Sequence, residues 1–188
     1  MSEANTNKYY GKYRGTVINN VDPEFRGRLM IIVPDVLGLV PSTWAEACAP
    51  LAGPTGPPMG VYMVPPIGAG VWVEFEQGNP DYPICTGCRF GAPTDVPLQA
   101  KLGIPADPNI VIQSLLQHAI IISDSPPSPP PPALPPAVPP PGGITLRSAT
   151  GASIVVNDAG VFISNGKGAT IMMVGPTVTI NNGALVVI

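Results

Sequence analysis

The stretch Gly151-Ala152-Ser153-Ile154-Val155-Val156 decides the fold of this chain, because the same pattern returns twice further along. Gly168-Ala169-Thr170-Ile171-Met172-Met173 repeats it, and Gly183-Ala184-Leu185-Val186-Val187 repeats it again. Turn formers such as Asn157-Asp158 and Asn165-Gly166 separate the copies. Apolar β-like segments that recur between turns are typical of an irregular β-repeat. The sequence therefore predicts strands across residues 142–188.

A single chain of such strands would lack a covering layer. The charged side chains between residues 142 and 188 are only Arg147, Asp158 and Lys167. Open sheet edges with so little charge invite aggregation, and the sequence offers no helix to cover them. Three chains wound about one axis would give each edge a neighbour, and each apolar side chain buried between them would contribute roughly 1.5–3 kcal/mol.

We therefore expect an intertwined trimeric β-helix or β-prism, which forms a needle. Its core is predicted to contain the residues Ile154, Val156, Val161, Ile163, Ile171, Met173, Val178 and Ile180. The alternative is an ordinary single-chain β-domain that completes the N-terminal one. Forty-odd residues of low-charge repeat make a poor independent core, which favours the trimer.

The N-terminal half shows a different pattern of short strands. They are predicted at residues 9–18, 27–33, 44–49, 60–64, 70–76 and 84–90. Within them Val71, Val73 and Phe75 alternate with polar or larger neighbours, a period of two. Five or six short strands without a credible helix predict a small closed barrel.

The chain as a whole divides into four predicted parts. Residues 1–8 are an N-terminal extension, 9–91 the barrel, 92–109 a connector and 110–188 the needle. Two further strands are expected at Ile110 to Gln113 and at Ala119 to Ser123. The proline tract 125–141 is expected to form an extended polyproline II loop inserted between strands. Its alternative role is a docking peptide for an aromatic-lined groove.

Composition limits the classes of partner. The 188 residues are 45% apolar and 11% charged, and the net charge of −3 argues against nucleic acid or an anionic membrane as the main partner. No apolar run has the ~18–20 residues that a membrane helix needs. Met1 to Lys8 is polar, so no secretory signal is expected. We expect synthesis in the cytoplasm and export only as part of an assembly.

No pattern predicts an enzyme, a metal site or a cofactor site. Cys85 and Cys88 have zinc-like spacing, but Cys48 is distant and His118 is the single histidine, too few ligands for tetrahedral zinc. We interpret these cysteines as buried or half-buried strand residues and His118 as structural. Glu74 and Glu76 share a predicted strand face and suggest a carboxylate pair, although a solvated or interface face explains them as well.

Several stretches, in this order and spacing, carry a resemblance. They are Tyr13-Arg14-Gly15-Thr16-Val17, Asn20-Val21-Asp22-Pro23-Glu24, Arg26-Gly27-Arg28, residues 33–38, Trp44-Ala45, residues 64–76, residues 78–83, residues 142–148 and residues 150–154. Together they resemble the phage baseplate assembly protein V family, which includes the barrel domains of tail spikes and of type VI secretion spikes.

The resemblance implies a function. It implies a homotrimer with OB-type barrels that sits on a ring-shaped hub protein and caps the inner tube of a contractile phage tail or phage-like injection system. Such a central spike pierces the target envelope, meets the membrane only on injection, and carries a conical PAAR-type tip protein. We expect the tip to dock on Leu185, Val186, Val187 and Ile188. Some members insert a lysozyme domain, but residues 92–141 are too short and proline-rich for one, so the spike is expected to be non-enzymatic.

Two alternatives belong to other classes. An OB-type barrel can bind nucleic acid through a basic groove with stacking aromatic residues. A small cluster of this kind lies near the start, formed by Lys8, Tyr9, Tyr10, Lys12, Tyr13 and Arg14. The other alternative is a structural fibre protein that does not inject.

Overall fold

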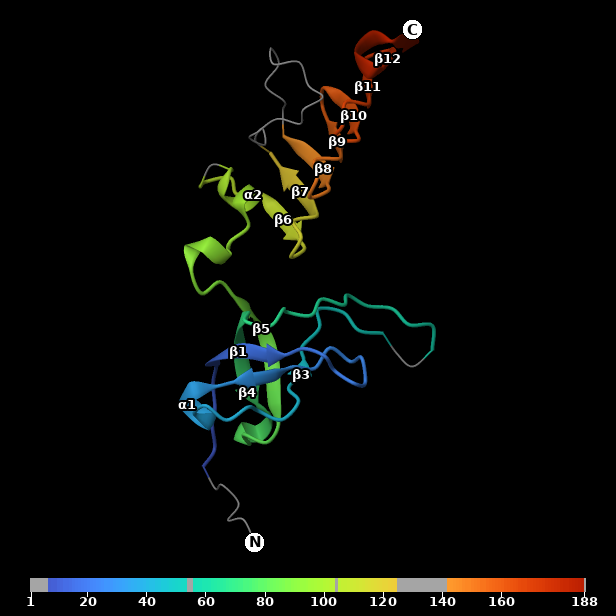
Figure 1. Ribbon diagram of the computed structural model, residues 1–188. Helices are drawn as coiled ribbons and strands as arrows, with labels where there is room; N and C mark the ends of the chain where they lie inside the picture. The colour runs from blue at the N-terminus through green and yellow to red at the C-terminus, as the bar shows by residue number, and fades with distance from the viewer. Residues whose placement is uncertain (1–6, 54–55, 104, 125–141, 188) are drawn as a thin grey trace. The chain divides into compact units, whose positions relative to one another are not determined.

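The computed structural model describes residues 7–53, 56–103, 105–124 and 142–187 (Figure 1). The expected all-β fold is confirmed, since these residues form a five-stranded and an eight-stranded sheet. The chain divides into two compact units, Met1–Pro93 and Thr94–Ile188, which we describe separately. The proline tract 125–141 lies outside the described residues, so its predicted conformation stays a prediction.

The first unit is built on one curved sheet. Its strands are β1 (Tyr13–Asn19), β2 (Met30–Ile32), β3 (Glu46–Ala47), β4 (Gly70–Phe75) and β5 (Pro83–Arg89). They lie in the order β2-β1-β4-β5-β3, with β3 parallel to β5 and the other pairs antiparallel.

A short contact joins the two ends of this strand order. Leu29, beside β2, and Ala45, beside β3, form an antiparallel bridge in which each N–H donates to the other's carbonyl, at 3.1 and 2.7 Å. Next to it, the N–H of Ser42 donates to the carbonyl of Ile31, and the Ile31 N–H donates to Ser42 Oγ. These bonds complete a ring of five short strands, the small barrel expected from the sequence.

The barrel interior follows from the period of two. In β4 the side chains of Val71, Val73 and Phe75 are buried, and those between them are not. The rest of the core comes from the facing strands and contains Val17, Leu29, Ile31, Val33, Ala45 and Cys85. Gly15 lies where β1 crosses this core, and a Cβ there would lie 2.5 Å from Ile31 Cγ2. Only a residue without a side chain fits this close approach.

Asp22 organises the turn between β1 and β2. Its carboxylate accepts hydrogen bonds from the backbone N–H groups of Glu24, Arg26 and Arg28. Arg28 also binds it through its side chain, with 2.7 Å between Nη2 and Oδ1, and the Asp22 side chain is only 2% exposed. The Arg28 guanidinium, followed by the backbone donors, holds the pKa of Asp22 well below its usual range.

Asp22→Asn is expected to destabilise the barrel most at neutral pH and less in strong acid. The lowered pKa means that the stabilisation by ionised Asp22 is fully present above the ordinary carboxyl pKa of about 4, and that it is lost progressively as the pH falls from there through the lowered pKa of the folded state. Trp44 and Trp72, the two tryptophans of the chain, both lie in this unit, so thermal unfolding followed by their fluorescence at pH 7 and about pH 2 measures the effect. Glu24→Gln is the control, because Glu24 pairs with the same arginine but is 56% exposed. An equal loss for Asp22→Asn at both pH values contradicts this role.

Some predicted elements of the barrel were wrong. Residues 60–64 form no strand and only a single bridge joins Gly60 to Ala52, because β5 is already paired on both sides by β4 and β3. The single-turn helix α1 (Pro34–Leu37) was not expected in the barrel, and α2 (Leu98–Lys101) was not expected in the second unit. Strand β4 ends at Phe75, and Glu76 begins the 3-10 turn η1 (Glu76–Gly78) instead of continuing the strand.

The second unit is a strip of eight strands. They are β6 (Ile110–Gln113), β7 (Ala119–Ser123), β8 (Gly143–Arg147), β9 (Ser153–Asn157), β10 (Gly160–Ser164), β11 (Thr170–Val174), β12 (Thr177–Ile180) and β13 (Leu185–Val187). Each pairs antiparallel with its neighbour in the sequence, so the strip is one continuous meander (Figure 1). Strands β6 and β7 have the bounds predicted from the sequence.

The same five-residue turn occurs three times along one long edge of the strip, where the strands turn; we call this edge one side of the strip. These capped turns are residues 114–118, 148–152 and 165–169. In each, the first residue's N–H donates to the carbonyl of the fifth residue, and the first side chain accepts from the fifth residue's N–H. The capping side chains are Ser114, Ser148 and Asn165, residues that favour such local bonds. The repeated turn fixes the register of the strand pair that it joins in each case.

Candidate functional site

Two parallel rows of apolar side chains cross one face of the strip. Strand register places Ile112, Ile120, Leu146, Ile154, Ile163, Ile171, Ile180 and Leu185 in the first row. The second row contains Ile110, Ile122, Ile144, Val156, Val161, Met173, Val178 and Val187. Every strand contributes one residue to each row, because alternate residues share a face. The rows therefore form one apolar surface from β6 to β13.

This surface is open to solvent in the single chain. Ile154 is 40% exposed, Val156 45% and Leu146 45%. On the opposite face, by contrast, Ile121, Val155 and Phe162 are at most 3% exposed. A contiguous apolar surface of this kind on a soluble protein marks a site of association.

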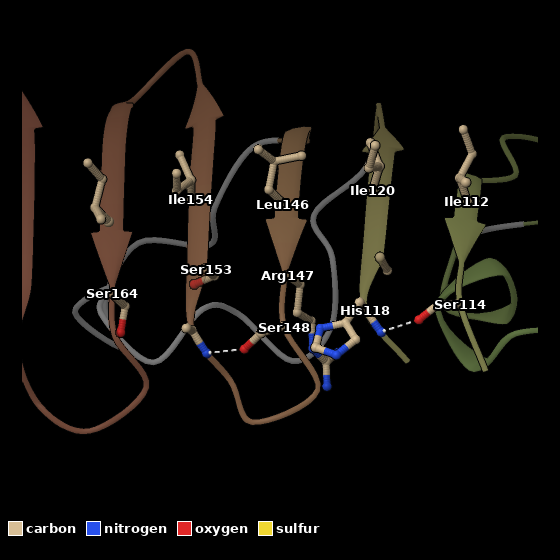
Figure 2. Close-up of a pocket in the computed structure, with 13 residues that line it drawn as sticks. Ile112, Ser114, His118, Ile120, Leu146, Arg147, Ser148, Ser153, Ile154 and Ser164 are labelled. Carbon is tan, nitrogen blue, oxygen red and sulfur yellow. Dashed lines mark hydrogen bonds between the residues drawn. The ribbon is translucent and has the colours of Figure 1, made fainter. Parts of the chain in front are cut away.

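The first row borders an open groove of about 530 Å³. Figure 2 shows Ile112, Ile120, Leu146 and Ile154 side by side on neighbouring strands, with the capped turns below them. Several of the hydroxyl groups at this border are already used within the turns, since Ser114 and Ser148 accept backbone N–H bonds. The groove therefore offers mainly hydrocarbon, which suits another apolar surface better than a polar small molecule.

All eight residues predicted for the needle core lie on this surface. Ile154, Ile163, Ile171 and Ile180 belong to the first row, and Val156, Val161, Met173 and Val178 to the second. Their burial between chains remains a prediction. Sequence reasoning missed the contributions of β6, β7 and β8, although the alternation in Ile110-Val111-Ile112 was a visible signal.

The residues predicted to dock the tip lie at the far edge of the strip. Leu185 and Val187 are in β13, the edge strand of the sheet order, and each is 53% exposed. Ile188 lies outside the described residues, as does the placement of the Val186 side chain. Tip docking there stays a prediction.

The thiols and the histidine form no chemical centre. Cys85 is buried in β5 as expected, but the same expectation is wrong for Cys48 and Cys88, which are exposed, and Cys48 lies just after the end of β3. Desolvation raises the pKa of the Cys85 thiol and that of Cys88. Raised values favour the neutral thiol over the thiolate that metals and redox reactions require. Within the described part of the chain no group of acidic, cysteine or histidine side chains has the geometry to hold a metal ion. His118 closes the first capped turn.

The other candidate site residues, the two glutamates and the aromatic-basic cluster, make contacts within the first unit. Glu74 forms an ion pair with Lys12 at 2.9 Å, and Glu76 lies in η1, so the two do not continue one strand. Tyr9 and Tyr13 pack on Phe75 at the barrel core, with ring centroids 6.3 and 5.7 Å from it. Two of the three tyrosines and one lysine of the proposed nucleic-acid cluster are thereby engaged within the chain, which weakens that alternative.

Each of the two units matches the model of a known protein family. Residues 13–90 match the model of the type VI secretion system/phage-baseplate injector OB domain. Residues 109–186 match the phage baseplate V C-terminal trimerisation domain. The chain belongs to the phage baseplate V family. The baseplate V trimerisation domain thus coincides with the strip that carries the two apolar rows.

This family has a structural role in baseplates and spikes, and the baseplate V assignment makes the chain a component of a phage tail or related particle. A search of curated proteins finds no match. Among the described residues, no helix is long and apolar enough to cross a membrane.

Proposed function

We propose that this protein is the central spike of a contractile phage tail or phage-like injection system and acts as a homotrimer without enzymatic activity. Three copies of the strip bury their two rows against one another around a common axis. The barrels cap the inner tube on a hub protein, and the needle is driven into the target envelope when the sheath contracts. The energy for piercing comes from the sheath.

The single observation that carries the proposal is the pair of apolar rows. They run without a break over eight strands of a domain whose family is named for trimerisation. Each side chain buried on association contributes roughly 1.5–3 kcal/mol, so sixteen per chain are ample for a permanent assembly.

The oligomeric state tests the proposal directly. Native mass spectrometry of the purified chain, diluted to nanomolar concentration, is expected to give a trimer of the 19.4 kDa chain and no monomer. A permanent needle should not dissociate on dilution, because the two rows of all three chains are buried in its core. A folded monomer under these conditions overturns the spike proposal.

A PAAR-type tip protein is proposed to dock at the β13 end of the needle. The trimer would present three exposed edge strands there, each with Leu185 and Val187 at its surface. Such an end is an apolar platform with unpaired backbone groups, suited to a small β-rich cap.

Deletion of residues 183–188 is expected to abolish co-purification of the tip protein while trimers persist. The remaining rows from β6 to β12 still hold the three chains together, so mass spectrometry should report an intact trimer. Lys167→Ala, in an exposed turn away from this end, serves as the control. Unchanged tip binding by the truncated trimer contradicts the docking site.

A further inference from the structure

The charges of the strip are separated by sign between its two sides. Among described residues from 110 onward, the fixed cations are Arg147 and Lys167, and both lie on the side of the capped turns. The anions are Asp124 and Asp158, and both lie on the opposite side, where the other ends of the strands turn. No ion pair joins any of the four to another described residue of the same chain. Each side therefore lacks the opposite charge within its own chain.

The first capped turn also departs from its equivalents. The positions of Leu115-Leu116-Gln117 are occupied by Ala149-Thr150-Gly151 in the second turn and by Gly166-Lys167-Gly168 in the third. Gln117 adopts a φ of 67° where the other two turns have glycine. Leu115 is 80% exposed and Leu116 73%. The turn thus tolerates a strained glutamine and two solvated leucines that the turn geometry does not require.

A groove lies on the opposite side of the strip, at nearly the same position along its length as this turn. It has a volume of about 460 Å³, and its apolar lining comes from Ile122, Ile144 and Val156 beside Gly142 and Gly143. Register runs from Gln113↔Ala119 at one end of the β6–β7 pair to Ile110↔Ile122 at the other, and Ile122 pairs with Ile144 in β8. The turn therefore lies at one end of β7, and the groove lies at the other end of β7 and of its neighbours β8 and β9. Asp124 and Asp158 stand at the rim of the groove.

We infer that adjacent protomers of the trimer join along a seam in which Leu115 and Leu116 of one chain insert into the Ile122–Ile144–Val156 groove of the next. The inference rests on the proposed trimer. A three-fold assembly is heterologous, so it brings one side of each strip against the other side of its neighbour at the same level. The seam buries the two leucines and places the side that carries Arg147 beside the side that carries Asp124 and Asp158. Three identical seams close the needle and fix its register.

Exchanging the turn tests the seam without disturbing the hairpin. The variant Leu115→Ala/Leu116→Thr/Gln117→Gly gives the first turn the sequence of the second, which forms the same hydrogen bonds. Loss of two buried leucines is expected to weaken association by at least about a hundredfold per seam. The trimer, followed on native gels through a guanidinium series, should therefore dissociate at lower denaturant. The control is Ala149→Gly/Thr150→Lys, which gives the second turn the sequence of the third and should leave the midpoint unchanged.

A cross-link identifies the contact. A photoreactive benzophenone side chain at position 116, in a mixture of isotope-labelled and unlabelled chains, is expected to link to residues 142–144 or 156–158 of a different chain. An unchanged midpoint of the exchanged turn, or links confined to the same chain, overturns the seam and leaves the trimeric spike intact. A monomeric parent protein overturns both.

Discussion

Replacing Ile154 with aspartate is expected to abolish the trimer. Ile154 lies in the middle of the first row, paired across strands with Leu146 and Ile163, and it is 40% exposed in the single chain. Each copy would lose about 2 kcal/mol of apolar burial and would place an unpaired carboxylate in the interface. Over three copies this weakens association by roughly four orders of magnitude. Native mass spectrometry at micromolar concentration should therefore show monomers, or aggregates formed through the exposed rows.

The matched control is Leu39→Asp in the first unit. Leu39 is 87% exposed, so the same change in charge and size occurs outside the strip and should leave the trimer intact. Tryptophan fluorescence confirms that the barrel of the Ile154 variant is still folded, because both tryptophans lie there. A stable trimer carrying Ile154→Asp would mean that the rows face solvent in the assembly.

Gly15→Ala is expected to destabilise the barrel by about 1–3 kcal/mol, because it adds a methyl group to a filled core. The new Cβ would lie 2.5 Å from Ile31 Cγ2 and 3.0 Å from Val73 Cγ2, and both neighbours are branched and buried. For a unit of this size the unfolding midpoint should fall by about 5–15 °C. Thermal unfolding followed by tryptophan fluorescence measures it, and Thr16→Ala on the exposed side of the same strand is the control.

A double-mutant cycle separates crowding from other effects. Ile31→Ala removes the atom that the new Cβ would meet, at its own cost of about 2–5 kcal/mol. In that background Gly15→Ala should cost little, and it is expected to stabilise slightly because alanine restricts the unfolded chain. An equal cost of Gly15→Ala in both backgrounds contradicts the close approach of β1 to Ile31.

Features with a regular period could be predicted from the sequence. The eight core candidates fell on one face because alternation in strands is strict, and a one-residue error would have moved all of them. The strand pair β6–β7 was also predicted with its bounds, since turn formers and a change of composition mark both ends. The same alternation in β4 identified Val71, Val73 and Phe75 as core.

Features set by distant contacts could not be predicted. The segment 60–64 has strand-like residues, but no free strand edge remains for it in the barrel. The requirement for glycine at position 15 depends on where Ile31 lies, and the role of Asp22 depends on the path of the following turn. The unusual leucine pair Leu115-Leu116 could not be recognised from the sequence, because the three turns differ in sequence and are alike only in their hydrogen bonds.

The meander has a mechanical consequence. Every strand of the strip is bonded only to its neighbours in sequence, and in antiparallel sheets these bonds run perpendicular to the strands, that is, along the length of the strip. Pulling on the two ends would open the bonds one pair at a time, like a zipper, whereas pushing presses each strand against the next. Such a rod resists compression along its length far better than extension.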